Sequence, residues 1–355
     1  MTADYLARLV DEAALRSYLT ECLGAASEFS IRRHRAGHSN ETLFLTWGER
    51  ELVLRRPPPG ETAETAHDVL REFAVIDALQ DSPVRVPTTV LACDDPDVIG
   101  AEFYLMGRER GRVIREAEPE RFATREHRRR VGEELLDRLV EIHRVDPVAV
   151  GLDAFGYPEG FTERQVRRWS EQLMWAFQVT AGEREVPALY EVMEWLYDAV
   201  PDDHPHTLVH GDYKLDNVMF GPGLPPTIAS IFDWEMSTLG DPFTDLGWLL
   251  SYWWDPKDPD PPASTGSLSA TFMARPGYPT RRALVERYER AMDLEFEHER
   301  FYRTLAVYKL AALGEMFYRR HLEGNADDPM YPKMREGVPA LADRAMRIID
   351  GEEPL

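Results

Sequence analysis

The feature that most constrains the fold is a change of character near residue 111. Before it, three short runs typical of strands, FSIRRHRAG, ETLFLTW and ELVLRR, are separated by the turn sequences GHSN and GER. A helical pattern around 64–80 and two further strand-like runs, near 88–93 and 101–106, complete this part. Residues 1–110 therefore predict a small antiparallel sheet with one inserted helix.

Helical periodicity dominates the rest of the chain. Over 123–144, Val131, Leu135, Leu139 and Ile142 repeat at the spacing of one helix face. Other helices are predicted over 3–23, 161–180, 185–200, 280–297, 299–322 and 333–350. Between them, HGDYKLDNVMF and TIASIFDW predict a short strand pair. The whole pattern predicts an α+β, bilobed protein with an N-lobe over 1–107, a helical C-lobe over 108–355, and a cleft where they join.

Charge and cysteine content exclude several classes of function. The 63 acidic and 41 basic residues give a formal net charge of -22, whereas a nucleic-acid partner requires a basic face. Cys22 and Cys93 lie far apart and suggest neither a disulfide framework nor a zinc site, which suits a reducing cytoplasm. The start of the chain lacks the apolar segment of a signal peptide, and the run LGWLLSYWW is too short to span a bilayer. We therefore expect a cytoplasmic protein without nucleic-acid or membrane partners.

Two stretches of the C-lobe carry residues suited to phosphoryl transfer. Residues 210–217 have the sequence HGDYKLDN, and the apolar run TIASIF ends at Asp233. Taken singly, HGD could be an ordinary turn and Asn217 part of a helix cap. Their joint spacing, however, supplies a residue to orient a hydroxyl nucleophile and two hard oxygen ligands for Mg²⁺. We therefore predict Asp212 as the catalytic base, and Asn217 and Asp233 as metal ligands.

These motifs also carry a resemblance to a known family. The stretches VHGDYKLDNVMF, FDWEMSTLGDPFTDLGW and VLRRPPPG resemble the aminoglycoside phosphotransferase family, small-molecule kinases with a protein-kinase-like fold. Within that family they look most like the kinase-like portion of acyl-CoA dehydrogenase fusion proteins, and the similarity runs from GHSNETLFL to YKLAALGEMFYRRHLEG. The resemblance implies ATP and Mg²⁺ as cofactors, the hydroxyl of a small molecule as acceptor, and the same roles for Asp212, Asn217 and Asp233.

Other polar residues near the motifs are expected to be structural. His210 is expected to shape the loop through hydrogen bonds rather than to take part in catalysis. Asp245, in GDPFTDLG, is expected to tie the following helix to the catalytic loop, and Asp241 to cap that helix. Glu235 carries no assigned role.

The N-lobe departs from the usual kinase pattern because it contains no lysine. Kinases place a lysine on the third strand, within V-A-I-K, but the first lysine here is Lys214. Strand alternation places Val53 and Arg55 on one face, and Leu54 and Arg56 on the other. We therefore predict that Arg55 reaches the ATP phosphates, that Val53 lies against adenine, and that Arg56 matters little.

The remaining nucleotide contacts are predicted around that strand. Glu72, in the helix VLREFAVI, is the expected partner of Arg55, and an ordinary solvated helix acid is the competing interpretation. The loop RAGHSNET has a single glycine and alone predicts only a hairpin turn. In the context of the family, Ser39 and nearby N–H groups would cover the phosphates. Backbone groups near Met106 and Arg108 would hydrogen-bond adenine.

The predicted function is therefore ATP-dependent transfer of a phosphoryl group to a small-molecule hydroxyl. The acceptor stays open, because the negative net charge favours a cationic sugar or aminocyclitol, whereas the branch of the family favours a hydroxyacyl-CoA-like metabolite. A nucleotide-binding pseudokinase is an alternative suggested by the missing lysine and opposed by Asp212, Asn217 and Asp233. A protein kinase is disfavoured because HRD, DFG and APE are all missing from the sequence.

Overall fold

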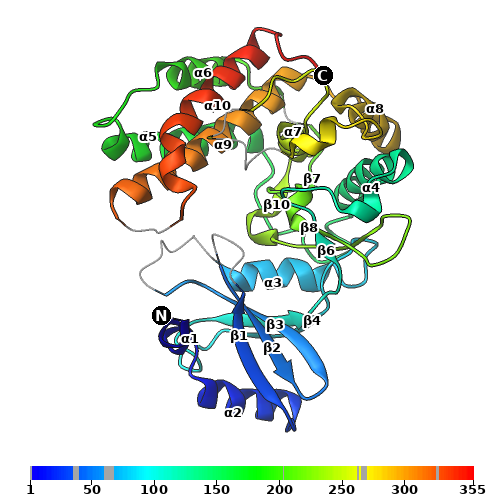
Figure 1. The fold of residues 1–355 in the computed structure, drawn as a ribbon, viewed down its shortest axis with the longest axis vertical. Helices are drawn as coiled ribbons and strands as arrows, with labels where there is room; N and C mark the ends of the chain where they lie inside the picture. The colour runs from blue at the N-terminus through cyan, green and yellow to red at the C-terminus, as the bar shows by residue number, and fades with distance from the viewer. Residues whose placement is uncertain are drawn as a thin grey trace.

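A five-stranded sheet and a group of helices occupy opposite ends of the molecule (Figure 1). The computed structural model describes residues 2–34, 40–59, 68–202, 204–261, 264, 270–324 and 328–355. Its α-helices are α1 (Thr2–Leu9), α2 (Glu12–Leu23), α3 (Val69–Ala78), α4 (Arg125–His143), α5 (Phe161–Thr180), α6 (Pro187–Asp198), α7 (Phe243–Tyr252), α8 (Arg281–Met292), α9 (Glu299–Leu322) and α10 (Met334–Ile349). Its strands are β1 (Phe29–His34), β2 (Glu41–Trp47), β3 (Arg50–Arg56), β4 (Thr89–Cys93), β5 (Phe103–Gly107), β6 (Arg112–Val113), β7 (Thr207–Val209), β8 (Val218–Phe220), β9 (Ile228–Ile231) and β10 (Thr238–Gly240).

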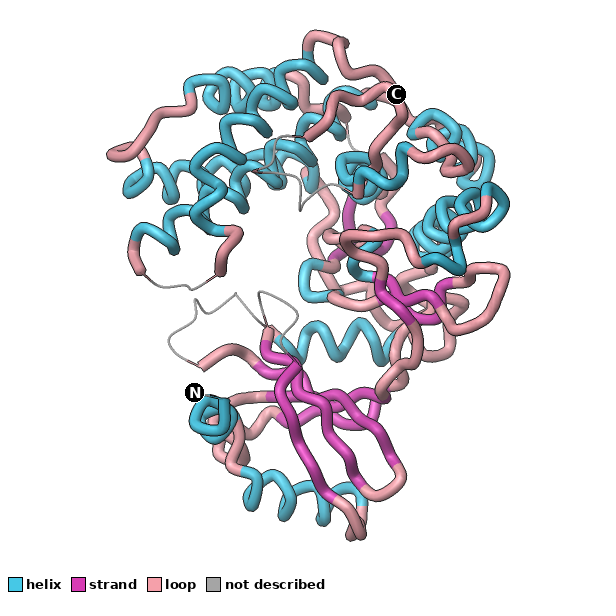
Figure 2. The backbone as a smooth tube through the Cα atoms, in the orientation of Figure 1, coloured by secondary structure: helices cyan, strands magenta, loops and turns pink. Residues whose placement is uncertain are grey.

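The large sheet is antiparallel throughout, in the order β1-β2-β3-β5-β4. In its centre Val53 pairs with Phe44 on one side and Met106 on the other. The helix α3 covers the face that carries Val53, and α1 and α2 cover the face that carries Leu54 (Figure 2). Because side chains alternate along a strand, Arg55 also belongs to the α3 face.

The helices of the C-terminal part surround α9. This 24-residue helix is buried along most of its length, against α10, α5 and α7. Two small antiparallel sheets, β6-β8-β9 and β10-β7, lie between these helices and the large sheet (Figure 1). The pair formed by β8 and β9 is the one predicted from HGDYKLDNVMF and TIASIFDW. Within the described residues, no helix is both long and apolar enough to cross a membrane.

The sequence prediction was wrong at two helix boundaries. The helix expected over 3–23 is divided into α1 and α2, because the Asp11 carboxylate accepts hydrogen bonds from the N–H groups of Ala13 and Ala14 and starts a new helix. The helix expected over 280–297 ends at Met292, where Asp293 adopts left-handed backbone angles. Both boundaries depend on aspartates that do not interrupt the apolar periodicity.

Candidate active site

A buried aspartate fixes the loop after β7 through hydrogen bonds to its backbone. Asp245, in the first turn of α7, accepts a hydrogen bond from His210 N–H at 2.6 Å and another from Gly211 N–H at 2.8 Å. A Cβ atom on Gly211 would meet the Met236 carbonyl oxygen at 2.5 Å, so only glycine fits. Burial would raise the pKa of Asp245, but its interactions with His143 and His210 together outweigh burial, and the pKa lies below its ordinary value. Asp245 therefore ties α7 to the loop, as predicted.

His210 and Asp241 have the structural positions expected of them. The ring of His210 hydrogen-bonds through Nε2 to the Phe232 carbonyl at 2.9 Å, which joins the loop to the end of β9. Burial lowers the pKa of His210, so the ring is neutral near pH 7. The Asp241 carboxylate accepts a hydrogen bond from Phe243 N–H at 2.9 Å, at the start of α7.

The Asp212 carboxylate has four hydrogen-bond contacts. Its Oδ1 accepts from Trp248 Nε1 at 2.8 Å and from Lys214 Nζ at 2.9 Å. Its Oδ2 accepts from Lys214 Nζ at 3.0 Å and from Asn217 Nδ2 at 2.8 Å. Burial would raise the pKa of Asp212, but the charges of Lys214 and Lys309 outweigh it, so the pKa is lower than usual. The carboxylate is therefore ionised and fixed in orientation.

Asn217 and Asp233 lie on neighbouring segments. The Asn217 carbonyl accepts a hydrogen bond from Phe232 N–H at 2.8 Å. This contact fixes the backbone one residue before Asp233. Asp233 has φ 68° and ψ 56°, left-handed angles that aspartate adopts more readily than most residues. Since Asn217 Nδ2 donates to Asp212, its Oδ1 is the oxygen left for a cation.

This donor set fits Mg²⁺ better than a transition metal. In the described part of the chain, no three His, Cys, Asp or Glu side chains gather into a metal-binding group. Mg²⁺ requires no such cage, because it is commonly held by one or two protein oxygens together with substrate phosphates and water. One amide oxygen from Asn217 and one carboxylate from Asp233 match that pattern.

An ion-pair network links the N-lobe sheet to this site. Arg55 NH2 lies 3.1 Å from the Glu72 carboxylate and 3.1 Å from Asp233 Oδ1. Burial would lower the pKa of Arg55, but the combined attraction of the acidic groups around it, Glu72 foremost and Asp233 among them, outweighs burial and holds the pKa well above its usual value. The Glu72 side chain is 1% exposed, so the interpretation as a solvated helix acid is wrong. The structure thus brings together three residues that the sequence had singled out, and adds a contact between Arg55 and Asp233 that it had not predicted.

The residues predicted to contact the nucleotide from the N-lobe differ in how well their positions suit that role. Val53 and Met106 are buried on the α3 face of the sheet, at opposite positions on β3 and β5. Arg108 N–H donates to the Glu51 carbonyl at 3.0 Å, and its guanidinium stacks over Phe44 at 4.4 Å. The Arg108 N–H therefore already has an acceptor, so the predicted adenine contact would need another backbone group. Ser39 lies outside the described residues.

Arg56 occupies the opposite face of β3, where it is 3% exposed. Its guanidinium donates to the carbonyls of Ile99, at 3.1 Å, and of Leu9, and its Nε donates to Pro57 at 3.0 Å. The expectation of a small role can apply only to nucleotide binding, because these contacts join α1 to the sheet.

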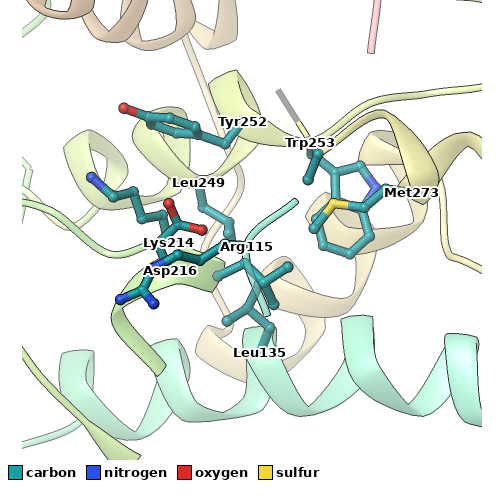
Figure 3. A pocket seen from close by; sticks show the side chains of 10 residues that line it. Arg115, Leu135, Lys214, Asp216, Leu249, Tyr252, Trp253 and Met273 are labelled. Carbon is teal, nitrogen blue, oxygen red and sulfur yellow. The ribbon is translucent and has the colours of Figure 1, made fainter. Parts of the chain in front are cut away.

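Sequence reasoning missed Lys309 and Trp248, which both lie beside Asp212. Lys309 Nζ donates to the Gly211 carbonyl at 2.5 Å and lies 4.0 Å from the centre of the Trp248 ring. The available signal was a lysine inside the apolar run LAVYKLAAL, in a chain that has only four lysines. Figure 3 shows a pocket that Lys214, Asp216 and Arg115 line together with Tyr252, Trp253 and Met273.

A family model agrees with this arrangement. Residues 30–284 match the model described as the phosphotransferase enzyme family, a range that includes most of the five-stranded sheet as well as Asp212, Asn217 and Asp233. This chain belongs to the phosphotransferase enzyme family.

Curated relatives of this phosphotransferase-family chain are much longer proteins. Acyl-CoA dehydrogenase family member 11 of Homo sapiens is 34% identical over 324 residues, which cover 89% of this chain and 40% of that protein. Acyl-CoA dehydrogenase family member 10 of Mus musculus is 32% identical over 330 residues, which cover 89% of this chain and 29% of that protein. The chain thus spans less than half the length of either relative.

Solved structures confirm the predicted kinase-like α+β fold. A Ralstonia eutropha protein, provisionally named an aminoglycoside phosphotransferase, has a TM-score of 0.81 at 26% identity over 96% of this chain and 99% of its own. The GDP complex of aminoglycoside 2'-phosphotransferase-IIIa has a TM-score of 0.63 at 13% identity, and covers 94% of this chain and 99% of its own. At that identity the second likeness concerns the fold alone.

Proposed function

We propose that this chain is a Mg²⁺- and ATP-dependent phosphotransferase whose acceptor is the hydroxyl group of a small molecule. The observation that carries the proposal is the convergence of Asp212, Asn217 and Asp233 with the pair of Arg55 and Glu72. These residues come from separate loops, strands and helices, and together they supply a base, two oxygen ligands and a cation for phosphates. Cys22 and Cys93 are free thiols, which supports the cytoplasmic location that we also propose.

In the proposed reaction, the acceptor hydroxyl lies against Asp212. The acceptor oxygen bonds to the γ-phosphorus as the bond between that phosphorus and the β–γ bridging oxygen breaks, and ADP leaves. The hydroxyl proton passes to Asp212, which is ionised and held by Trp248 and Asn217. Mg²⁺, when bound by Asn217 and Asp233, would neutralise charge on the phosphates.

Arg55 supplies the N-lobe cation in this proposal. Its guanidinium is positioned by Glu72 and lies next to Asp233, so it can reach phosphates that share the metal. Val53 and Met106 would contact adenine from the sheet, with groups near Arg108 at the base edge, and Ser39 would cover the phosphates. A cation in this position opposes the pseudokinase alternative, which rested on the missing lysine.

The catalytic base is tested by Asp212→Asn. We expect nucleotide binding to stay within a few-fold, and kcat to fall by roughly 10²–10⁴, the usual range for loss of a positioned base. Asp198→Asn, on the exposed side of α6, removes the same charge far from the loop and serves as the matched control. Near-normal turnover in a folded Asp212→Asn protein would remove Asp212 from this role.

The metal ligands are tested by calorimetry of MgATP binding. Asp233→Ala should abolish Mg²⁺-dependent nucleotide binding and turnover, because it removes the charged ligand. Asn217→Ala should mainly raise the Mg²⁺ concentration required, because a neutral ligand is lost. Unchanged MgATP affinity in Asp233→Ala would place the metal elsewhere.

The acceptor class is tested by a screen for substrate-stimulated ADP release. The panel contains hydroxylated metabolites, aminoglycosides and hydroxyacyl-CoA compounds, which separate the two acceptor classes predicted from the sequence. Release of ADP with a member of the panel supports the phosphotransferase. Tight nucleotide binding without any stimulated release would instead support the pseudokinase.

A further inference from the structure

Residues 233–237, the bridging segment, follow β9 and contact two parts of the molecule at once. The ring centres of Trp234 and His210 lie 4.6 Å apart. The backbone of Met236 lies so close to Gly211 that a Cβ atom on that glycine would meet the Met236 carbonyl oxygen at 2.5 Å. The even-numbered residues of the segment therefore pack against the catalytic loop.

The odd-numbered residues of the bridging segment contact the large sheet and α3 instead. Each accepts a hydrogen bond from that side: Asp233 from Arg55 at 3.1 Å, Glu235 from Asn40 at 3.0 Å, and the Ser237 carbonyl from Arg71 at 3.1 Å. The helix α3 also packs directly against the short 3₁₀ helix η3 (Trp234–Met236) inside the segment. The segment that carries a predicted metal ligand is therefore held from both sides, by contacts that alternate along the chain.

The side chain of Asn40 is not explained by the fold alone. Asn40 lies immediately before β2 and is 5% exposed. Its Nδ2 donates to Glu235, whereas its Oδ1 is buried and has no hydrogen-bond partner among the described residues. A buried acceptor without a donor destabilises a folded protein, so packing alone would favour an apolar side chain at this position. The amide is therefore explained by its hydrogen bond to Glu235.

Nucleotide binding would affect the hydrogen bonds of the bridging segment differently. In the proposed function, Asp233 binds Mg²⁺ and Arg55 binds phosphates, so the direct bond between these two residues is exchanged for contacts with MgATP. The bond between Asn40 and Glu235 involves neither residue and can persist. Thr42, two residues after Asn40 and on the same face of β2, pairs with Arg55 and accepts a hydrogen bond from it at 3.3 Å. The bond to Glu235 thus holds the part of the sheet that supports Arg55.

We propose that the hydrogen bond between Asn40 and Glu235 is a positioning contact, which keeps the large sheet against the bridging segment while MgATP enters the site. This inference rests on the proposed function. During entry Arg55 exchanges Asp233 for the phosphates, and the positioning contact prevents the two sides from separating. Without it, a smaller fraction of molecules has the arrangement that binds MgATP, and the apparent affinity falls with that fraction.

Calorimetry of MgATP binding in the absence of an acceptor tests the contact. Asn40→Ala and Glu235→Ala should each weaken binding about tenfold, as expected for the loss of one hydrogen bond to a charged group. The double variant should also lose about tenfold rather than about a hundredfold, because both substitutions remove the same bond. Glu235→Gln keeps an oxygen that accepts from Asn40, so it should recover most of the affinity lost in Glu235→Ala. A general loss of folding would give neither the shared limit nor the recovery.

A matched control and a second measurement separate this contact from other effects. Asp77, near the end of α3, is exposed and accepts a hydrogen bond from Thr89 at 2.7 Å. Asp77→Ala removes that bond away from the bridging segment and should leave MgATP affinity unchanged. In nucleotide-free protein, the amides of residues 233–237 should exchange hydrogen faster in Asn40→Ala than in the wild type, and at the wild-type rate in Asp77→Ala.

Several outcomes overturn the proposal. They are wild-type affinity in Asn40→Ala, independent losses that multiply in the double variant, and unchanged hydrogen exchange of the bridging segment in Asn40→Ala. Equal losses in Glu235→Gln and Glu235→Ala would also overturn it, because the charge of Glu235 would then act directly on the metal or nucleotide. A wild-type protein that bound no MgATP would overturn the proposed function together with this inference. Binding in the wild type with unchanged binding in the variants would overturn this inference alone.

Discussion

Arg55 and Arg56 are neighbours on β3, yet they belong to two different regions of the molecule. Arg55 faces α3 and the segment after β9, where it lies between the carboxylates of Glu72 and Asp233. Arg56 faces α1 and α2, where its hydrogen-bond acceptors are backbone carbonyls. Because adjacent residues of a strand point to opposite faces, Arg55 lies among negative charges, whereas Arg56 binds backbone carbonyls. The residue type alone therefore says little about function, whereas the face of the sheet says much.

The largest expected effect on this contrast comes from Arg55→Ala. We predict that kcat/KM for ATP falls by an amount equivalent to ~2–4 kcal/mol of transition-state stabilisation, because a desolvated charge contact with the phosphates is lost. The measurement is steady-state kinetics at saturating Mg²⁺, after circular dichroism confirms folding. A decrease of less than threefold would place the phosphate-binding cation elsewhere.

Arg56→Ala should affect folding rather than turnover. Removal of the guanidinium leaves buried carbonyls of α1 and of the loop before β5 without donors, at a cost of ~1–3 kcal/mol in the free energy of unfolding. Urea denaturation measures that loss, and kcat/KM for ATP should stay within about threefold of the wild-type value at temperatures where the variant is folded. If Arg56→Ala impaired catalysis without loss of stability, the division between the two faces would be wrong.

Arg55→Lys sharpens the comparison, because it keeps the positive charge and removes the planar guanidinium with its several N–H donors. Arg55 uses three nitrogens at once: Nε donates to Glu72, Nη1 to Thr42, and Nη2 to both Glu72 and Asp233, which one ammonium group cannot do. We expect a loss of ~1–2 kcal/mol in kcat/KM for ATP, between the wild type and Arg55→Ala. Wild-type kinetics in Arg55→Lys would show that charge alone is required.

Arg110→Ala should give the smallest effect. Its ion pair with Glu51 lies at the surface, where the Arg110 side chain is 83% exposed and water screens the charges. Neither the denaturation midpoint nor kcat/KM for ATP should change beyond experimental error. A measurable loss in either assay would mean that exposed arginines of the N-lobe act with those of β3.

The sequence predicted features that depend on local spacing. Alternation correctly placed Val53 and Arg55 on one face, whereas the roles predicted for Asp212, Asn217 and Asp233 from the intervals within HGDYKLDN and TIASIFDW stay predictions. The helix start at Asp11 escaped prediction, because a cap competes with periodicity over only a few residues.

Features produced by packing between distant segments could not be predicted in the same way. Trp248 reaches Asp212, and Lys309 reaches the neighbouring Gly211 carbonyl, only because α9 packs against α7. The donation of Arg108 N–H to the Glu51 carbonyl likewise depends on the start of β3 lying beside the end of β5. The contact between Arg55 and Asp233 joins residues 178 positions apart. Periodicity describes one element at a time and does not report such pairs.

In the proposed reaction, the enclosure of Asp212 would also limit the hydrolysis of bound ATP. A carboxylate has about four lone-pair sites, and the contacts from Trp248, Lys214 and Asn217 fill all four when no acceptor is bound. A water molecule that drifts in finds no free oxygen able to orient it for attack on the γ-phosphate. An acceptor that displaces Lys214 from the carboxylate would open such a site. Hydrolysis of ATP without acceptor would therefore stay slow, and each ADP formed would correspond to one phosphorylated product.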